Sequence, residues 1–212
     1  MALVFIDLDG TLIKEKSSER CFFFFLLRKR ILRIPQIIAF LSFAGRYLPQ
    51  YGNIVWKKNK AYLAGLGEEE IMAAARAFVR EDILNSIRPE MKERIIRHRL
   101  DSDEAILLTG SLSYLAKPVA DHVGINQVSA TICTAQNGRL DSLPPLVHPF
   151  HLEKRQIAKA ICQDRGISLT DCTAYGDSIH DLPLLEAVGR PVAVHPDRRL
   201  KKIARRRSWE IL

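Results

Sequence analysis

The hydrophobic pattern begins with four apolar residues, Leu3-Val4-Phe5-Ile6, which are typical of a buried strand. From about Ser17 to Arg99 the apolar positions recur at helical spacing instead. The predicted helices of this stretch cover 22–33, 35–47, about 54–64 and 68–85, with breaks at Pro35, Pro49 and 65–67. We therefore expect a helical insertion after the first strand.

From Ala105 the pattern alternates between short apolar runs and helical segments. Strands are predicted at 105–108, near 128–133, at 172–175 and at 192–194, a turn at Asn137-Gly138, and helices from about 111 to 122, 152 to 164, 181 to 188 and 198 to 206. Repeated βα units favour an α/β fold, a parallel sheet with helices on both faces. Ligands bind beyond the carboxyl ends of such strands, where Asp7, Thr109 and Asp177 fall.

Composition supports a globular protein. The 212 residues are 47% hydrophobic and 26% charged, which fits one domain or one domain with an insertion. The four cysteines form no CxxC pair, so we expect reduced thiols rather than disulfides or a zinc site. No leader precedes the first strand, and we expect a cytoplasmic protein.

The formal charge of +8 is concentrated in two segments. Between Lys14 and Lys60 eleven Lys and Arg face two acids, and 198–207 adds seven bases. Such segments attract anionic ligands or lipid headgroups, and they also keep proteins soluble. The uncharged stretch 34–45 is too short to span a bilayer. The basic, aromatic segment 21–30 favours a helix packed inside the cap, and peripheral membrane contact is the alternative.

Two carboxylates directly follow the first strand, in Asp7-Leu8-Asp9-Gly10-Thr11-Leu12. Residues two apart on an extended chain point to the same side, so Asp7 and Asp9 can address one ligand while Gly10 lets the backbone turn away. One carboxylate could attack a phosphorus atom, and its neighbour could transfer protons.

A second acidic pair, Asp177 and Asp181, follows a later apolar strand. Asp177 beside Asp7 predicts a site for a hard cation with oxygen ligands, for which Mg²⁺ is the natural choice. Lys154 would neutralise phosphoryl oxygens, and Thr109 with the amides after it, at the start of a helix, would bind the remaining ones. Together these residues predict phosphoryl transfer chemistry.

At this point the sequence resembles the haloacid dehalogenase superfamily, in its phosphoserine-phosphatase-like branch, subfamily IB. The resemblance rests on Asp7-Leu8-Asp9-Gly10-Thr11-Leu12, Leu107-Leu108-Thr109-Gly110-Ser111, Lys154, and Gly176-Asp177-Ser178 through Asp181-Leu182-Pro183-Leu184-Leu185, and it continues through 188–194 and 209–212. It covers essentially the whole predicted core.

The resemblance implies a Rossmann-like core of residues 1–13 and 100–212, an all-helical cap of 14–99, and Mg²⁺-dependent phosphomonoester hydrolysis. By this resemblance Asp7 is the nucleophile, Asp9 the acid/base, and Thr109 and Lys154 bind phosphate. Asp7, Asp177, Asp181 and the backbone carbonyl of Asp9 would hold the metal. Thr11, Gly110 and Ser111, from the same motifs, are further candidates for substrate binding.

The segment after the first motif departs from phosphoserine phosphatases, which carry a glutamate there to bind the substrate amine. Here it reads Lys14-Glu15-Lys16, so Glu15 is a candidate substitute, although the lysines favour an anionic substrate. Glu153 stands where many relatives have glycine. His148 and His151 are expected at the substrate entrance rather than in a zinc site, and His180 at the rim.

Three functional hypotheses follow. The leading one is a Mg²⁺-dependent phosphatase of small soluble phosphomonoesters, and the second keeps this chemistry for a membrane lipid phosphate ester. The third is a noncatalytic module that binds anions or nucleic acid, for which no nucleic-acid motif is present. The leaving group, transfer to water or to another hydroxyl, and the oligomeric state stay open.

Overall fold

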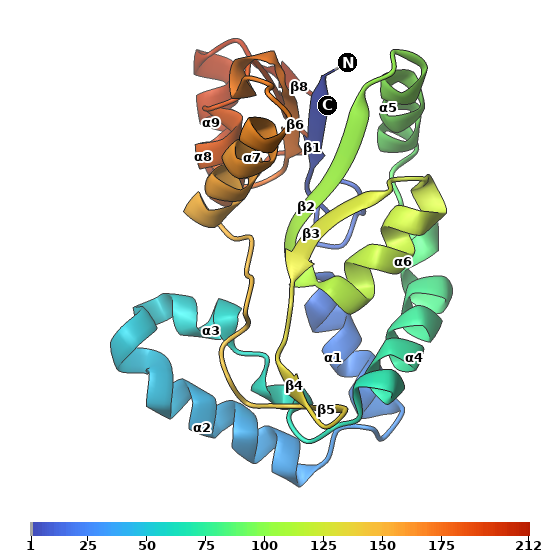
Figure 1. Cartoon of the computed structure of the whole chain (residues 1–212), viewed down its shortest axis with the longest axis vertical. Helices are drawn as coiled ribbons and strands as arrows, with labels where there is room; N and C mark the ends of the chain where they lie inside the picture. The colour runs from blue at the N-terminus through green and yellow to red at the C-terminus, as the bar shows by residue number, and fades with distance from the viewer. Residues whose placement is uncertain (1) are drawn as a thin grey trace.

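The computed structural model describes residues 2–212 and has a parallel sheet at its centre (Figure 1). Its strands are ordered β3-β2-β1-β6-β7-β8, and every neighbouring pair is parallel. They span β1 (Leu3–Ile6), β2 (Glu104–Leu112), β3 (Gln127–Thr131), β6 (Thr173–Gly176), β7 (Arg190–Ala193) and β8 (Glu210–Ile211). The predicted α/β fold with a parallel sheet is confirmed.

The two faces of the sheet bury separate hydrophobic clusters. Leu3 and Phe5 pack with α7 (Leu152–Asp164), α8 (Leu182–Leu185) and α9 (Arg198–Arg206). Val4 and Ile6 point to the opposite face, which α5 (Pro89–Leu100) and α6 (Ser113–Val123) cover. Because successive residues of a strand point to opposite faces, four apolar residues in a row suit a strand covered on both sides.

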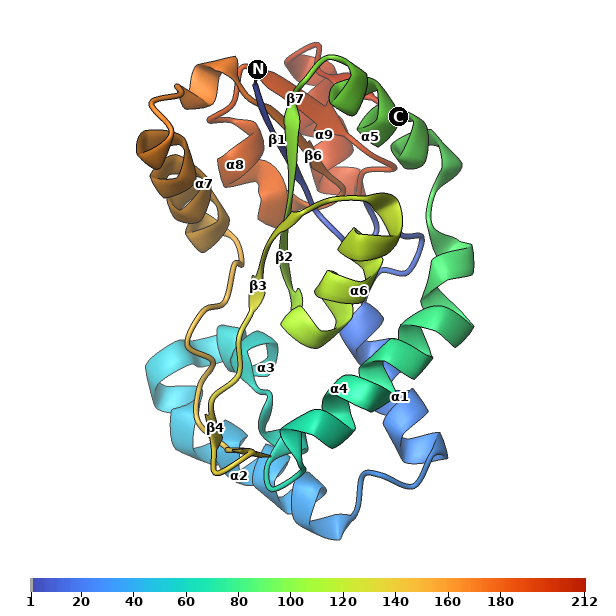
Figure 2. The same cartoon turned by 45° about the vertical axis from the view of Figure 1, so that its right-hand side comes forward.

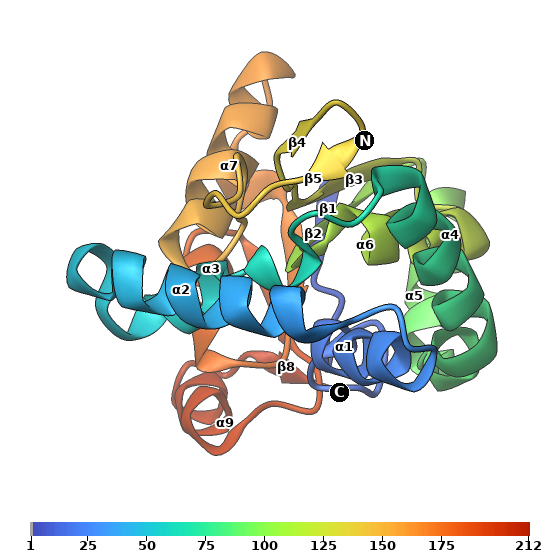
Figure 3. The same ribbon diagram turned by 90° about the horizontal axis from the view of Figure 1, so that it is seen from below.

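The remaining helices lie beyond the carboxyl ends of the strands (Figures 1 and 2). They are α1 (Ser18–Arg28), α2 (Ile34–Tyr51), the short α3 (Val55–Lys58) and α4 (Glu68–Phe78), joined by the 3-10 turns η1 (Gly52–Ile54) and η2 (Ala61–Leu63). Seen from below, α2 crosses the end of the molecule (Figure 3). Helices inserted between β1 and β2 therefore stand over the edge of the sheet where the candidate residues lie.

A short hairpin from the second half of the chain joins these helices. Strands β4 (Ala135–Gln136) and β5 (Arg139–Leu140) pair antiparallel around Asn137-Gly138, whose positive φ angles suit a tight hairpin turn. Leu140 donates to the Leu66 carbonyl at 2.9 Å and accepts from the Gly65 N–H at 2.7 Å. The helical cap is thus extended by a segment outside 14–99, and the division into two domains stays a prediction.

Several predicted boundaries were wrong. Pro49 does not break α2, which continues to Tyr51. Proline lacks the N–H that would donate to the preceding turn, but so close to the end of the helix this removes a hydrogen bond from the last turn only. The expected helix 54–64 is interrupted at Asn59, which is extended and whose side chain bonds the Ala61 N–H and the Phe40 carbonyl. Strand β2 continues to Leu112, and α6 begins only at Ser113, so Thr109 is not at a helix start.

Candidate active site

The carboxyl ends of β1 and β6 bring the first and last acidic motifs together. The Asp7 N–H donates to the Tyr175 carbonyl at 3.1 Å, which places Asp7 beside the strand that leads to Asp177. Lys154 reaches the same point from the first turn of α7. Asp7, Asp9, Thr109, Gly110, Ser111, Lys154, Asp177 and Asp181 all line one cavity of about 710 Å³.

A buried lysine connects two of the carboxylates. Lys154 Nζ donates to Asp7 Oδ1 at 2.7 Å and to Asp181 Oδ1 at 2.6 Å. Oxygen atoms of Asp7, Asp177 and Asp181 all lie within 4.8 Å of one another, and Lys16 Nζ lies 2.6 Å from Asp177. Among residues 2–212, these three carboxylates lie close enough together to hold one metal ion. Their oxygen donors suit a hard divalent cation.

Burial makes Asp7 and Asp177 costly to ionise. Burial raises the pKa of Asp7, although the charge of Lys154 acts to lower it. Burial also raises the pKa of Asp177, although the hydrogen bond from Lys16 acts to lower it. Burial alone would lower the pKa of Lys154, but Asp181 and Asp7 raise it above its ordinary value. Additional positive charge at this cluster would favour the ionised carboxylates.

Two glycines permit the close approach of the acidic side chains. Gly10 has φ +75°, and a Cβ there would lie 2.3 Å from Asp177 Oδ2. A Cβ at Gly176 would lie 2.6 Å from the Asp181 Cβ. Asp181 Oδ2 also accepts from the Ser178 N–H at 3.2 Å and its hydroxyl at 3.1 Å, which fixes the side chain.

Asp9 is held apart from the metal-binding group. Its Oδ1 accepts from the Ser18 N–H at 2.7 Å, and its Oδ2 accepts from the Ser111 hydroxyl. The Thr109 Oγ1 accepts from the Ser111 N–H at 3.1 Å, which leaves the Thr109 hydroxyl proton available to a ligand. That the Asp9 carbonyl binds the metal stays a prediction.

Thr11 does not reach the cavity. Its side chain is fully buried, lies outside the cavity wall, and its hydroxyl has no partner among the described residues. The turn after Gly10 directs this side chain inward. The prediction that Thr11 binds substrate is therefore not supported by its position.

His148 presents an acceptor at the cavity wall. Thr131 Oγ1 donates to the Gly110 carbonyl at 2.6 Å, so at 2.9 Å it accepts from the protonated Nδ1 of His148. Nε2 then carries a lone pair, and it has no partner within residues 2–212. Burial, with the charges of Lys60, Lys58 and Lys57, lowers the pKa of His148 to about 3. His148 and His180 line the cavity as expected, whereas His151 does not.

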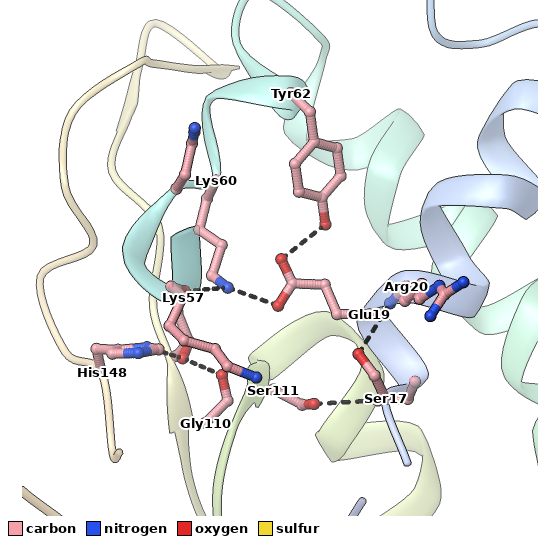
Figure 4. A network of polar contacts seen from close by, with 12 residues as sticks. Ser17, Glu19, Arg20, Lys57, Lys60, Tyr62, Gly110, Ser111 and His148 are labelled. Atoms are coloured by element: carbon pink, nitrogen blue, oxygen red, sulfur yellow. Dashed lines mark hydrogen bonds and ion pairs between the residues drawn. The ribbon is translucent and has the colours of Figure 1, made fainter. Parts of the chain in front are cut away.

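A polar cluster in the cap lines the same cavity (Figure 4). Glu19 accepts from Lys60 Nζ at 2.5 Å and from the Tyr62 hydroxyl at 3.1 Å. No local pattern marks these residues, because Glu19 and Lys60 meet only after the cap folds. Lys16 lines the cavity but Glu15 does not, so the suggested role of Glu15 in binding the substrate amine is not supported by its position.

Asp197 is a further residue of the wall that sequence reasoning missed. It caps α9 by accepting from the Arg199 and Leu200 N–H groups at 2.9 and 2.8 Å, and its other oxygen accepts from the Ile179 N–H. An aspartate directly before a predicted helix is the signal that would have found it.

Comparison with known proteins agrees with this geometry. The family model described as haloacid dehalogenase-like hydrolase matches residues 4–186. The chain belongs to this family. It is accordingly an enzyme, a haloacid dehalogenase-type phosphatase, which overturns the hypothesis of a noncatalytic module.

Relatives of this phosphatase match nearly its full length. Phosphoserine phosphatase SerB1 of Mycobacterium tuberculosis is 27% identical, over 99% of this chain and 70% of that protein. Histidinol-phosphatase of Neisseria meningitidis is 28% identical, over 99% of this chain and 97% of the relative. A solved structure of a protein of unknown function from Bordetella pertussis Tohama I superimposes with a TM-score of 0.83 at 26% identity, over 100% and 97% of the two chains.

Proposed function

We propose that this phosphatase hydrolyses small phosphomonoesters with Mg²⁺ through a phosphorylated Asp7. The observation that carries the proposal is the cluster itself: the Asp7 carboxylate lies on the cavity wall, 2.7 Å from Lys154 and within 4.8 Å of oxygens of Asp177 and Asp181. A nucleophile, a cationic partner and a metal-binding group thus converge on one point.

In the first step an oxygen of Asp7 attacks phosphorus, and the bond from phosphorus to the leaving oxygen breaks. Asp9 donates a proton to that oxygen, which departs as an alcohol. In the second step Asp9 takes a proton from water, the water oxygen attacks phosphorus, and the bond from phosphorus to the Asp7 oxygen breaks, which gives inorganic phosphate and the free Asp7 carboxylate. Ser111 and the Ser18 N–H hold Asp9 in place for both transfers.

Asp7, Asp177 and Asp181 would hold Mg²⁺, with the Asp9 carbonyl as a further ligand. The bound ion would neutralise the negative charge that gathers on the transferred phosphoryl group. Lys154 adds a fixed positive charge at the same place, and the Thr109 hydroxyl can donate to a phosphoryl oxygen.

The names of two relatives support a small substrate, since one is a phosphoserine phosphatase and the other a histidinol-phosphatase. Besides the phosphate-binding residues, the cavity is lined by Lys16 and by His148, whose Nε2 can accept a hydrogen bond. These groups suit a leaving group that carries both an anionic group and a hydrogen-bond donor.

A lipid phosphate ester is the second candidate, and one observation favours it. Four aromatic side chains from the cap helices line the same cavity as Asp7: Phe23, Phe24, Phe40 and Trp56. They give the cavity an apolar wall that could accommodate hydrocarbon.

The test is phosphate release from amino-acid, sugar, nucleotide and lipid phosphomonoesters, with Mg²⁺ and with a chelator. We expect turnover that needs the metal and is lost in Asp7→Asn, while Asp101→Asn, an exposed aspartate outside the cavity, keeps full activity. Full turnover by Asp7→Asn would refute the proposed nucleophile.

A further inference from the structure

Helix α2 is apolar on both of its sides. Phe43 and Ala44 are buried against the protein, over a small cluster that includes Val55. The opposite side carries Ile34, Ile37, Ile38, Leu41 and Leu48, with exposed fractions between 46% and 72%. Helices that are apolar all round are normally enclosed by protein or lipid, yet no described residue covers this side of α2.

Neighbouring elements of the cap also carry exposed apolar side chains. Phe24 and Leu27 on α1, and Ile54 and Trp56 at η1 and α3, are also exposed. We call these nine residues the apolar face: Phe24, Leu27, Ile34, Ile37, Ile38, Leu41, Leu48, Ile54 and Trp56. They belong to the elements at the cap end of the molecule, away from the sheet (Figures 1 and 3). Exposed apolar side chains that gather on one end of a protein mark a site of interaction.

The chain segment that forms the apolar face carries only basic charges. Residues 20–67 contain no Asp or Glu, and they carry Arg20, Arg28, Lys29, Arg30, Arg33, Arg46, Lys57, Lys58 and Lys60. Four of these bases pair with acids from elsewhere in the chain: Arg28 with Asp82, Lys29 with Glu81, Lys58 with Glu153 and Lys60 with Glu19. Arg30, Arg33 and Arg46 have no ion-pair partner within residues 2–212. Basic residues beside an apolar helix face are typical of elements that lie on anionic lipid.

The apolar face also meets the active-site cavity. Phe24 and Trp56 belong both to the face and to the cavity wall. Phe40, on the cavity side of α2, lies 5.9 Å from Trp56 between ring centroids. A surface that covers the face would therefore contact two residues of the cavity wall.

We propose that the apolar face docks on an anionic lipid membrane, with α2 lying in the plane of the bilayer surface. Within residues 2–212 no helix combines the length and apolarity needed to cross a bilayer, so the contact is peripheral. A second copy of the chain fits this face poorly, because a two-fold interface would set the bases around one face against the same bases of the other. Lipid headgroups supply the missing negative charge.

Vesicle flotation of the full chain tests the proposal, with phosphatidylcholine vesicles that contain or lack phosphatidylglycerol, at 150 mM salt. We expect association with the anionic vesicles, at least tenfold weaker binding to phosphatidylcholine alone, and release at high salt. Absence of binding to anionic vesicles, or equal binding to both kinds, would overturn the proposal.

Substitutions in the apolar face provide a second test of membrane docking. Ile38→Glu with Leu41→Glu should abolish flotation, while Leu100→Glu, an equally drastic change at an exposed residue of α5, should not. All three positions lie outside the cavity wall, so turnover of a soluble ester should be unchanged and shows that each variant is folded. Flotation retained by the double variant would overturn the proposal.

Gel filtration tests whether a second copy of the chain, rather than lipid, covers the apolar face. A wild-type dimer that Ile38→Glu with Leu41→Glu converts to a monomer, without vesicle binding by the wild type, would show self-association instead and overturn the proposal. Membrane docking does not depend on the proposed chemistry: absence of turnover with every ester would refute the proposed hydrolysis and leave flotation unaffected.

Discussion

Gly10 and Asp177 approach so closely that position 10 has no room for a side chain. A Cβ at Gly10 would lie 2.3 Å from Asp177 Oδ2 and 3.1 Å from Lys16 Nζ. The first motif thus supplies a glycine to the active site as well as its two carboxylates. Because Gly10 has no side chain, Asp177 can approach Asp7.

Gly10→Ala should reduce turnover at least tenfold, because the added methyl group displaces Asp177 from the metal-binding group. Gly138→Ala is the matched control: its φ of +73° is equally unfavourable for alanine, at a cost of roughly 1–2 kcal/mol, but a Cβ there meets nothing within 4 Å. Steady-state kinetics with thermal unfolding separates the two effects. Similar kinetic losses in both variants would show that strain, and not Asp177, is responsible.

Lys154→Met should destabilise the protein, because it leaves Asp7 and Asp181 buried without their cation. Breaking a buried ion pair costs about 3–5 kcal/mol. Mg²⁺ should recover part of this loss, since it supplies positive charge to the same carboxylates. Chemical unfolding with and without Mg²⁺ measures both quantities, and a variant as stable as the wild type in chelator would contradict the pairing.

Removal of divalent metal should lower the melting temperature of the wild type, because Mg²⁺ binds the folded state only. At a concentration a hundred times its dissociation constant the ion contributes about 2.7 kcal/mol. Asp177→Asn should lose most of this shift, whereas Asp101→Asn should keep it. Equal Mg²⁺ shifts in the two variants would place the metal elsewhere.

His148 should make the protein less stable in mild acid. Its folded pKa of about 3 lies below the ordinary 6.5, so the unfolded chain binds more protons in that window and stability falls as pH decreases below 6.5. Between pH 7 and pH 5 the wild type should lose about 2 kcal/mol more than His148→Gln does. His122→Gln, at an exposed site on α6, should follow the wild type. Parallel profiles for His148→Gln and the wild type would refute a buried neutral His148.

Periodicity predicted those elements whose sequence is regular along its whole length. Helices α7 and α9 begin and end where the sequence placed them, and β1 ends directly before Asp7. The hairpin of β4 and β5 escaped prediction as strands, because two residues per strand carry no period. The interruption at Asn59 depends on a bond to the Phe40 carbonyl, a partner from another helix that no local pattern reveals.

In the candidate site, too, residues marked by a local pattern were predicted and residues brought together by packing were not. Asp7, Lys154 and Asp181 were predicted because strand ends and motif spacing place them, and the structure brings them together. Glu19 and Lys60 meet only through packing of the cap, so their positions in the sequence carried no signal. Cap residues of this kind form much of the cavity wall, so the sequence predicted the chemistry more readily than the leaving group.

The most direct test is to quench a Mg²⁺-containing reaction with acid within the first turnovers and map the phosphorylated peptide by mass spectrometry. The phosphoryl group should be found on Asp7 in the wild type and be absent from Asp7→Asn. With an aryl phosphate, whose leaving group needs no proton from Asp9, it should accumulate in Asp9→Asn because only the second step is then slowed. A phosphoryl group on another residue, or rapid turnover with none on Asp7, would contradict the proposed mechanism.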